Sequence, residues 1–243
     1  MNFNSIIGQD IITVSLKNAV KNNTIANGYI LSGPRGCGKK LTACIFAMAL
    51  NCSSRIEDNP CGICSSCIRT ENGSHPNVEI VKPTGTTIKI KQIRDIINEV
   101  AKKPFESGYK VVILEDAEKM TFDAQDAFLK TLEEPPANTV FLLLTENHNS
   151  ILPTILSRCQ LYQFKPLDIK TIEGYLRNRH VYSEEDISIA ARHSRGVIGR
   201  ALEFLENKDL LRTRDTYIEI LDTVLTGHCS SALRLVSDTI DSK

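Results

Sequence analysis

A run of glycines and lysines near the N-terminus, Gly33-Pro34-Arg35-Gly36-Cys37-Gly38-Lys39-Lys40, has the spacing of a phosphate-binding loop. In such loops, glycines let backbone N–H groups face a phosphate, the following helix points its positive end at it, and a lysine reaches the outer phosphates. The residues that meet these requirements here are Gly33, Gly36, Gly38 and Lys39. We therefore expect a nucleotide-type phosphate site.

The position after the loop lysine normally carries a hydroxyl that ligates Mg²⁺. This chain has Lys40 there, and an ammonium can donate hydrogen bonds but cannot coordinate a metal ion. An apolar strand at 29–31 before the loop and an apolar helix at 41–50 after it argue against a glycine-rich turn that arose by chance. We expect ATP binding to be weak or absent, and hydrolysis of Mg²⁺·ATP to be impaired.

Further polar groups follow apolar segments that read as buried strands. Glu115 and Asp116 come after 111–114, and carboxylates at such a position hold Mg²⁺ and orient the attacking water in phosphate-loop proteins. Thr145 follows 140–144, where a hydroxyl could sense a γ-phosphate. Alone, the two acids would be read as solvated groups at a sheet edge. The loop upstream favours the nucleotide site instead.

Four of the eight cysteines are clustered with the spacing C-x8-C-x2-C-x2-C, at Cys52, Cys61, Cys64 and Cys67. Two overlapping Cys-x-x-Cys turns and one preceding cysteine can close a tetrahedral thiolate site, for which zinc is the expected ion. Such a site has no open position and is structural. Reduced free thiols or a redox pair are the alternatives. We expect a zinc-binding insertion at about 51–68.

The composition is that of an ordinary globular protein, with 243 residues of which 42% are hydrophobic. The 29 basic and 29 acidic residues cancel, so the overall charge does not support autonomous binding to DNA. Apolar runs stay below the ~18 residues of a membrane span, and the N-terminus lacks the pattern of a secretory signal. A cytoplasmic protein is expected.

Strand and helix patterns alternate up to about residue 166, which predicts an α/β fold with a parallel sheet flanked by helices. Strands are expected at 29–32, 78–81, 111–114, 140–144 and 161–164, with helices at 41–50, 91–100 and 124–133. From there on, helical patterns at 169–178, 184–193 and 197–205 predict a small helical domain over 167–208. Residues 209–243 read as the beginning of a further helical domain.

Several motifs together resemble the bacterial clamp-loader ATPases of the AAA+ superfamily. They are Ile7-Gly8-Gln9, the phosphate loop, the four-cysteine insertion, EDAEKM at 115–120, FLKTLEEPP at 128–136 and LPTILSRC at 152–159. The resemblance spans roughly the first two hundred residues. It implies an AAA+ phosphate-loop domain with a zinc insertion, a helical lid at 167–208 and the start of a helical collar at 209–243.

Two kinds of subunit in this family share the zinc insertion and the Ser-Arg-Cys motif, the tau/gamma motor and the delta-prime subunit. Motor subunits have Thr after the loop lysine and Asp-Glu after the third strand, whereas this chain has Lys40 and Glu115-Asp116. The sensor-arginine position falls on Gly199, and Arg200 comes one residue late, about 100° around a helix. These departures favour the delta-prime kind.

That resemblance implies a stator in a five-subunit clamp loader with tau/gamma and delta subunits, which loads the sliding clamp onto primed DNA as part of the DNA polymerase III holoenzyme. Arg158 would be an arginine finger that acts in trans on a neighbouring ATP site, with Ser157 and Cys159 shaping its turn. A self-sufficient ATPase motor is the first alternative. A zinc-ribbon nucleic-acid binder is the second, and the neutral charge argues against it.

Overall fold

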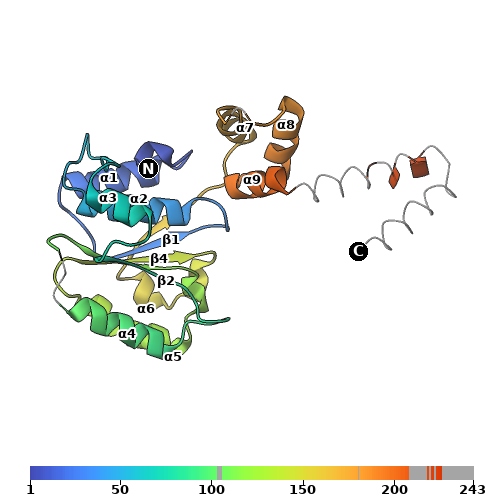
Figure 1. The fold of residues 1–243 in the computed structure, drawn as a ribbon. Helices are drawn as coiled ribbons and strands as arrows, with labels where there is room; N and C mark the ends of the chain where they lie inside the picture. Colours follow the sequence, from blue (N-terminus) through green and yellow to red (C-terminus); the bar gives the residue numbers. More distant parts are fainter. Residues whose placement is uncertain (103–105, 180, 208–217, 219, 222, 226–243) are drawn as a thin grey trace. The chain divides into compact units, whose positions relative to one another are not determined.

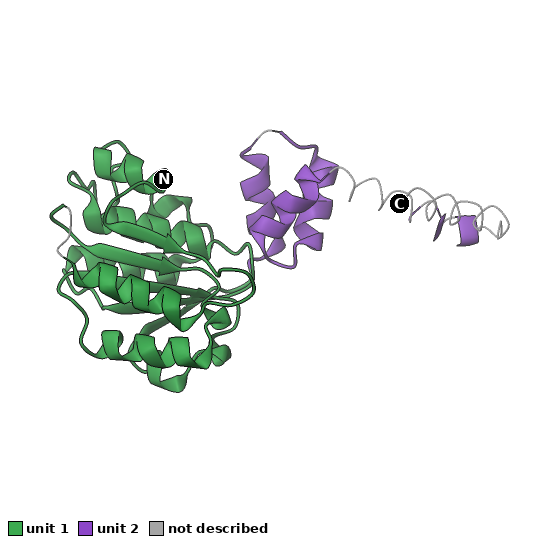
Figure 2. Ribbon diagram, turned by 60° about the horizontal axis from the view of Figure 1, so that its bottom comes forward, with its two compact units in different colours: residues 1–166 green, residues 167–243 purple. Residues whose placement is uncertain are grey.

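The computed structural model describes residues 1–102, 106–179, 181–207, 218, 220–221 and 223–225. The chain divides into two compact units, Met1–Pro166 and Leu167–Lys243 (Figure 2). The expected collar segment at 209–243 lies almost entirely outside the described residues. Among the described residues, no helix has the length and apolarity to cross a membrane.

A five-stranded parallel sheet forms the centre of the first unit, as the alternation of patterns predicts. The strands are β1 (Gly28–Ser32), β2 (Val78–Val81), β3 (Lys110–Leu114), β4 (Thr139–Thr145) and β5 (Gln160–Gln163). Their order is β2-β3-β4-β1-β5, and the register places Ser32 opposite both Thr145 and Gln163. Because all strands run the same way, the loops that follow them meet at one edge of the sheet.

Helices cover both faces of this sheet (Figure 1). The helices of the first unit are α1 (Asp10–Lys21), α2 (Lys39–Asn51), α3 (Ser65–Glu71), α4 (Ile90–Ala101), α5 (Phe122–Glu133) and α6 (Pro153–Leu156), with short 3-10 turns η1 (Phe3–Ser5), η2 (Ala117–Lys119) and η3 (His148–Ser150). The three inner strands, β1, β3 and β4, are mostly apolar because residues on both faces of a covered parallel sheet are buried, whereas the edge strands β2 and β5 are more exposed.

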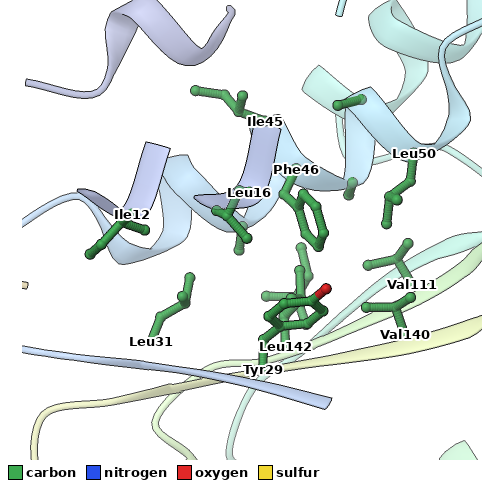
Figure 3. Packing of buried hydrophobic residues seen from close by; sticks show 14 of the residues in the cluster. Ile12, Leu16, Tyr29, Leu31, Ile45, Phe46, Leu50, Val111, Val140 and Leu142 are labelled. Atoms are coloured by element: carbon green, nitrogen blue, oxygen red, sulfur yellow. The ribbon is translucent and has the colours of Figure 1, made fainter. Parts of the chain in front are cut away.

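Alternation along the strands divides the apolar side chains between two cores. Tyr29 and Leu31 pack with α1 and α2 on one face, whereas Ile30 packs with α4 and α5 on the other. Figure 3 shows the first core, in which Phe46 of α2 stands over Tyr29 with the ring centroids 5.1 Å apart. Phe46 is fully buried, and its truncation to alanine would cost about 3–5 kcal/mol.

Two side-chain amides hold segments in place that are not hydrogen-bonded within the sheet. Asn51, at the end of α2, accepts a hydrogen bond from the Tyr109 N–H at 2.9 Å and donates to its carbonyl at 3.1 Å. A Cβ on Gly108 would clash with the Asn51 side-chain oxygen, so glycine is required there. Gln9 makes the same two-sided contact with the backbone of Lys165. These contacts hold the start of the cysteine segment against β3, and the N-terminal segment against the end of β5.

The second unit is helical, with α7 (Ile169–Arg177), α8 (Glu184–His193) and α9 (Ile198–Glu206). The side chains of Asp168 and Ser183 accept hydrogen bonds from backbone N–H groups in the first turns of α7 and α8. The three helices bury a separate apolar cluster that includes Ile172, Leu176 and Phe204. This unit therefore has a core of its own.

Candidate functional site

The phosphate loop lies between β1 and α2, at the carboxyl edge of the sheet. Gly36 and Gly38 have φ angles of 86° and 99°, in the left-handed region that favours glycine, and α2 begins directly after Gly38. The loop borders a cleft of about 430 Å³. The cleft is lined by Arg35, Gly36, Gly38, Lys39, Lys40, Leu41, Glu115, Asp116, Glu118, Lys119, Leu144 and Glu146. The glycines thus give the loop a backbone conformation that suits a phosphate group.

Lys40 forms an ion pair across this cleft with Glu115. The Lys40 Nζ lies 2.9 Å from the Glu115 Oε1, and the Glu115 side chain is only 21% exposed. The ammonium therefore provides the positive charge that a metal ion would bring to this carboxylate. Because Lys40 also replaces the hydroxyl ligand, the cleft does not fit a Mg²⁺ ion of the usual kind.

The second carboxylate of the cleft is paired as well. Asp116 accepts a hydrogen bond from the Lys119 ammonium at 2.8 Å, and its φ of 53° turns the chain directly into η2. The Lys39 ammonium donates to the carbonyls of Gly33 and Pro34, at 2.5 Å and 3.0 Å. Four basic and four acidic side chains line the cleft, so their formal charges cancel.

Thr145 and Gly33 are the two expected nucleotide residues that do not line the cleft. Thr145 is 1% exposed, and its hydroxyl accepts a hydrogen bond from the Asn147 N–H at 3.1 Å. The Gly33 N–H donates to the Thr145 carbonyl at 3.1 Å, which joins the start of the loop to the end of β4. Because side chains alternate along a strand, Leu144 and Glu146 face the cleft and Thr145 does not.

The four clustered cysteines converge, with all four sulfur atoms within 4.8 Å of one another. The Cys61–Cys67 and Cys52–Cys64 sulfur pairs are both 4.0 Å apart. Zinc–sulfur bonds of about 2.3 Å in a tetrahedron place sulfurs about 3.8 Å apart. The arrangement and the thiol donors therefore fit a metal ion such as zinc.

Local backbone geometry favours the thiolate form of two of the four cysteines, whereas burial raises the pKa of Cys52 and Cys67. Cys52 caps the end of α2, and Cys64 caps the start of α3. Burial opposes ionisation of Cys64, but the N–H groups of Cys67 and Ser53 outweigh it and lower the pKa of the thiol to about 6. The N–H groups of Ile63 and Cys64 likewise lower the pKa of Cys61. Thiolates are the form that binds a metal.

His75 supports the same cluster without belonging to it, and sequence reasoning missed it. Its Nδ1 accepts a hydrogen bond from the Asn77 N–H at 3.1 Å, so its Nε2–H donates to the Ser66 hydroxyl at 3.0 Å. Burial, and then the charge of Arg69, lower the pKa of this imidazole, which keeps it neutral. A lone histidine beyond the last cysteine gives no spacing signal by which to find it.

Arg158 lies at the opposite edge of the sheet from the phosphate loop. It precedes β5, whose Gln160 pairs with Tyr29 at the beginning of β1, whereas the loop follows the end of β1. The length of the strand separates the two by roughly 15 Å. The guanidinium pairs with Glu133 at 2.8 Å and donates to the Thr154 carbonyl at 2.9 Å. It cannot serve the cleft of its own chain.

The turn that carries Arg158 is held by its neighbours. Ser157 donates a hydrogen bond to the Thr154 carbonyl at 2.9 Å. The Cys159 sulfur packs against Gly28, where an added Cβ would lie only 2.5 Å from it. The exposed guanidinium, 37% accessible, is therefore carried on a fixed turn.

In the second unit, Gly199 and Arg200 lie in the first turn of α9. Arg200 contributes to a cleft of about 610 Å³ that the sequence did not indicate. This cleft is lined by Arg192, His193, Arg195, Arg200, Glu203 and Phe204, and we refer to it as the arginine cleft.

Comparisons with known proteins place these features in context. A family model described as DNA polymerase III, delta subunit, matches residues 8–168. DNA polymerase III subunit tau of Bacillus subtilis is 35% identical over 227 residues, which cover 89% of this chain and 40% of that protein. Subunit delta' of the same organism is 33% identical over 209 residues, which cover 86% of this chain and 63% of that protein.

The chain thus spans less than two thirds of either relative, and the two identities are nearly equal. Among solved structures, the Thermotoga maritima RuvB Holliday junction branch migration motor superposes with a TM-score of 0.57 at 14% identity. That match covers 86% of this chain and 64% of the other. At this identity, the likeness concerns the fold.

Proposed function

Because this chain belongs to the AAA+ clamp-loader family, matching the family model described as DNA polymerase III, delta subunit, we propose that it is a stator subunit of the delta-prime kind. In this role it joins tau/gamma and delta subunits in the cytoplasm and helps to load a sliding clamp onto primed DNA. It contributes to ATP hydrolysis at a neighbour's site and hydrolyses little or no ATP itself. Zinc in the cysteine cluster has a structural role.

The Lys40–Glu115 ion pair is the observation that carries this proposal. A motor subunit needs Mg²⁺ to bridge the phosphates and neutralise the charge that develops during transfer. Here an ammonium lies 2.9 Å from the carboxylate beside the phosphate loop, and no hydroxyl stands at the ligand position. The backbone cradle can hold a phosphate group, but the catalytic metal has no suitable site. Binding without turnover is the expected behaviour.

The position of Arg158 supports the second half of the proposal. A guanidinium that is exposed, fixed on a turn and remote from the phosphate-loop cleft of its own unit is suited to act on a site in a neighbouring chain. Arginine fingers supplied in trans stabilise the charge of the transferred phosphoryl group. The pair with Glu133 is exposed and weak, so the guanidinium can exchange it for a phosphate oxygen at little cost.

The alternative function, a self-sufficient ATPase motor, is favoured by the 35% identity to subunit tau and by the intact Gly38-Lys39 pair. The two functions differ in what the isolated chain does. A motor binds ATP tightly in a Mg²⁺-dependent way and turns it over. A stator shows neither property, and its effect is measurable only with its partners present.

Substitution of Arg158 tests the stator proposal directly. We expect Arg158→Ala, reconstituted with tau/gamma and delta subunits, to assemble normally and to lower DNA-stimulated ATP hydrolysis at the neighbouring site that receives this arginine by about 10³-fold, the typical contribution of such a finger. Glu133→Gln is the matched control, because it removes the ion pair and keeps the guanidinium. It should leave hydrolysis close to that of the wild type. Unchanged hydrolysis in Arg158→Ala would remove the finger from the proposal.

A further inference from the structure

The arginine cleft of the second unit lies between the end of α8 and the beginning of α9. Arg192 and His193 come from the last turn of α8, Arg195 from the connection, and Arg200 from the first turn of α9. The His193 ring stacks on Phe204, with the ring centroids 4.7 Å apart. Two helix ends and a rigid ring pair thus frame the cleft.

The three arginines of this cleft have no ion-pair or side-chain hydrogen-bond partner among the described residues. Other arginines of the same unit do have partners. Arg177 pairs with Glu184 at 2.9 Å, and Arg179 donates to the Tyr175 hydroxyl. Glu203 is the one acid that lines the cleft, as far as the described residues go. The cleft therefore has a net positive charge that the described residues do not balance.

The position of Arg192 on its helix is favourable for a positive charge, whereas the position of Arg200 is not. Arg192 lies in the last turn of α8, where a cation interacts favourably with the helix dipole. Arg200 lies in the first turn of α9, where the dipole opposes a cation, and α9 has neither a side-chain cap nor an acidic residue in that turn. An anion in the cleft would relieve this repulsion.

The backbone conformation of Arg195 is also unfavourable for a residue with a side chain. Its φ is 51°, in the left-handed region, and it occupies the position after the α8 cap that usually carries glycine or asparagine. An arginine gains nothing from that conformation by itself. The position does direct a third guanidinium to the cleft that Arg192 and Arg200 also line.

We propose that the arginine cleft binds a phosphate group. Guanidinium forks match phosphate oxygens, and unsatisfied N–H groups at a helix start favour the same anion. Three guanidiniums and a helix start can use more oxygens than the two that a carboxylate offers. The phosphate can belong to a small molecule or to a nucleic-acid strand, and both carry the same recognised group. The proposal does not depend on the stator role.

The test measures binding of two phosphate probes to the full chain, pyrophosphate by calorimetry and a fluorescent ten-nucleotide thymidine strand by anisotropy. We expect Arg195→Gln/Arg200→Gln to weaken binding of at least one probe by about tenfold or more. Arg177→Gln removes a paired arginine from the same unit and is the matched control. Lys39→Ala disables the phosphate loop of the first unit. Neither control should change the binding.

Arg195→Gly separates a loss of phosphate binding from a loss of binding caused by misfolding. Glycine suits the left-handed φ of this position, so we expect this variant to melt at or above the wild-type temperature and still to bind the probes more weakly. A purely structural arginine would not show stability and affinity moving in opposite directions.

The two probes identify the source of the phosphate. Binding of pyrophosphate that the strand does not outcompete assigns the cleft to small phosphorylated molecules. Preferred binding of the strand, with a salt dependence whose log–log slope falls by about 0.7 for each arginine–phosphate pair that a variant removes, assigns it to nucleic acid. The proposal is overturned if neither probe binds, if Lys39→Ala abolishes the binding, or if a poly-glutamate peptide binds as well as both phosphate probes.

Discussion

The cysteine cluster and the phosphate-loop cleft both contain groups that could hold a metal ion. They differ in the source of the positive charge, which would be a bound ion in the cluster and is supplied by lysine side chains in the cleft. In the cluster, four sulfur atoms lie within 4.8 Å of one another and are approached by backbone N–H groups. In the cleft, Glu115 and Asp116 each lie within 3 Å of a lysine ammonium. As thiolates, the four cysteines would need a cation to hold them together, whereas the cleft contains positive charges of its own.

Whether a cluster of ligand groups binds a metal ion therefore depends on the positive charges that already lie beside it. Thiolates that crowd together repel one another, so the bound ion is part of the folding free energy. Carboxylates that already have ammonium partners lose those partners if a metal enters. The exchange then gains little, because each new metal–carboxylate bond replaces an existing ion pair.

Removal of the metal should produce the largest effect. We expect a strong zinc chelator, or Cys67→Ala, to lower the free energy of unfolding by about 4 kcal/mol, equivalent to about 10 °C in Tm for a chain of this size. Cys67 is fully buried beside Met48, so the loss spreads to the core under α2. Thermal unfolding followed by circular dichroism measures it.

Cys44→Ala is the matched control for that experiment, because Cys44 belongs to α2 but lies outside the cluster. It removes one thiol and should cost about 1 kcal/mol or less. Extraction of zinc without any shift in Tm would contradict the structural role of the cluster.

Conversion of the cleft to the metal-dependent kind should produce an intermediate effect. In Lys40→Thr the ammonium beside Glu115 is lost and a hydroxyl ligand is restored. We expect ATP to bind about tenfold more tightly in the presence of Mg²⁺ than in its absence, whereas the wild-type chain shows weak binding that does not respond to Mg²⁺. Calorimetry with and without Mg²⁺ measures both.

Lys40→Thr/Lys39→Ala controls for the site, since it should abolish the gained binding. The opposite result in the wild type, tight binding that requires both Mg²⁺ and Lys39, would show that Lys40 is tolerated. The contrast between cluster and cleft would then fail, and the motor alternative would be the better description of this chain.

The smallest expected effect is the coupling free energy of the Lys40–Glu115 ion pair. A double-mutant cycle with Lys40→Met and Glu115→Gln should give a coupling of about 0.5–1 kcal/mol in urea unfolding, which decreases at high salt. The Lys119–Asp116 pair is the matched comparison, with both side chains 44% exposed. Its coupling should be smaller, because water screens it more. A larger value for the outer pair would contradict this picture of the cleft.

Much of the fold follows from patterns that the sequence shows locally. The strand at 111–114 is predicted because apolar residues run without interruption between polar ends, which suits a strand buried on both faces. Helix α4 is predicted because Ile93, Ile96 and Val100 recur on one helical face, and all three are buried. The cysteine cluster follows from spacing alone, since three of its four members lie within seven residues.

Pairings between distant segments could not be predicted in the same way. Lys40 and Glu115 are 75 residues apart, and their contact depends on β1 and β3 ending at one edge of the sheet. Thr145 is a polar residue at a strand end, but whether its side chain points into the cleft or away from it depends on the residue at which the strand ends. The arginine cleft could not be found from the sequence because each of its arginines, taken singly, resembles an ordinary solvated charge on the surface.

The parallel register of β1 and β5 gives the first unit a polarity that matters for assembly. Its phosphate loop lies at one end of this strand pair and Arg158 at the other. A neighbour in the same orientation, placed at the Arg158 end, can receive this arginine at its own cleft and offer its own arginine to the next unit. Units that repeat this contact in one orientation follow one another head to tail, a heterologous arrangement that closes into a ring or continues as a helix. In such an assembly, the direction of the strands in each subunit determines on which side its arginine meets the next cleft.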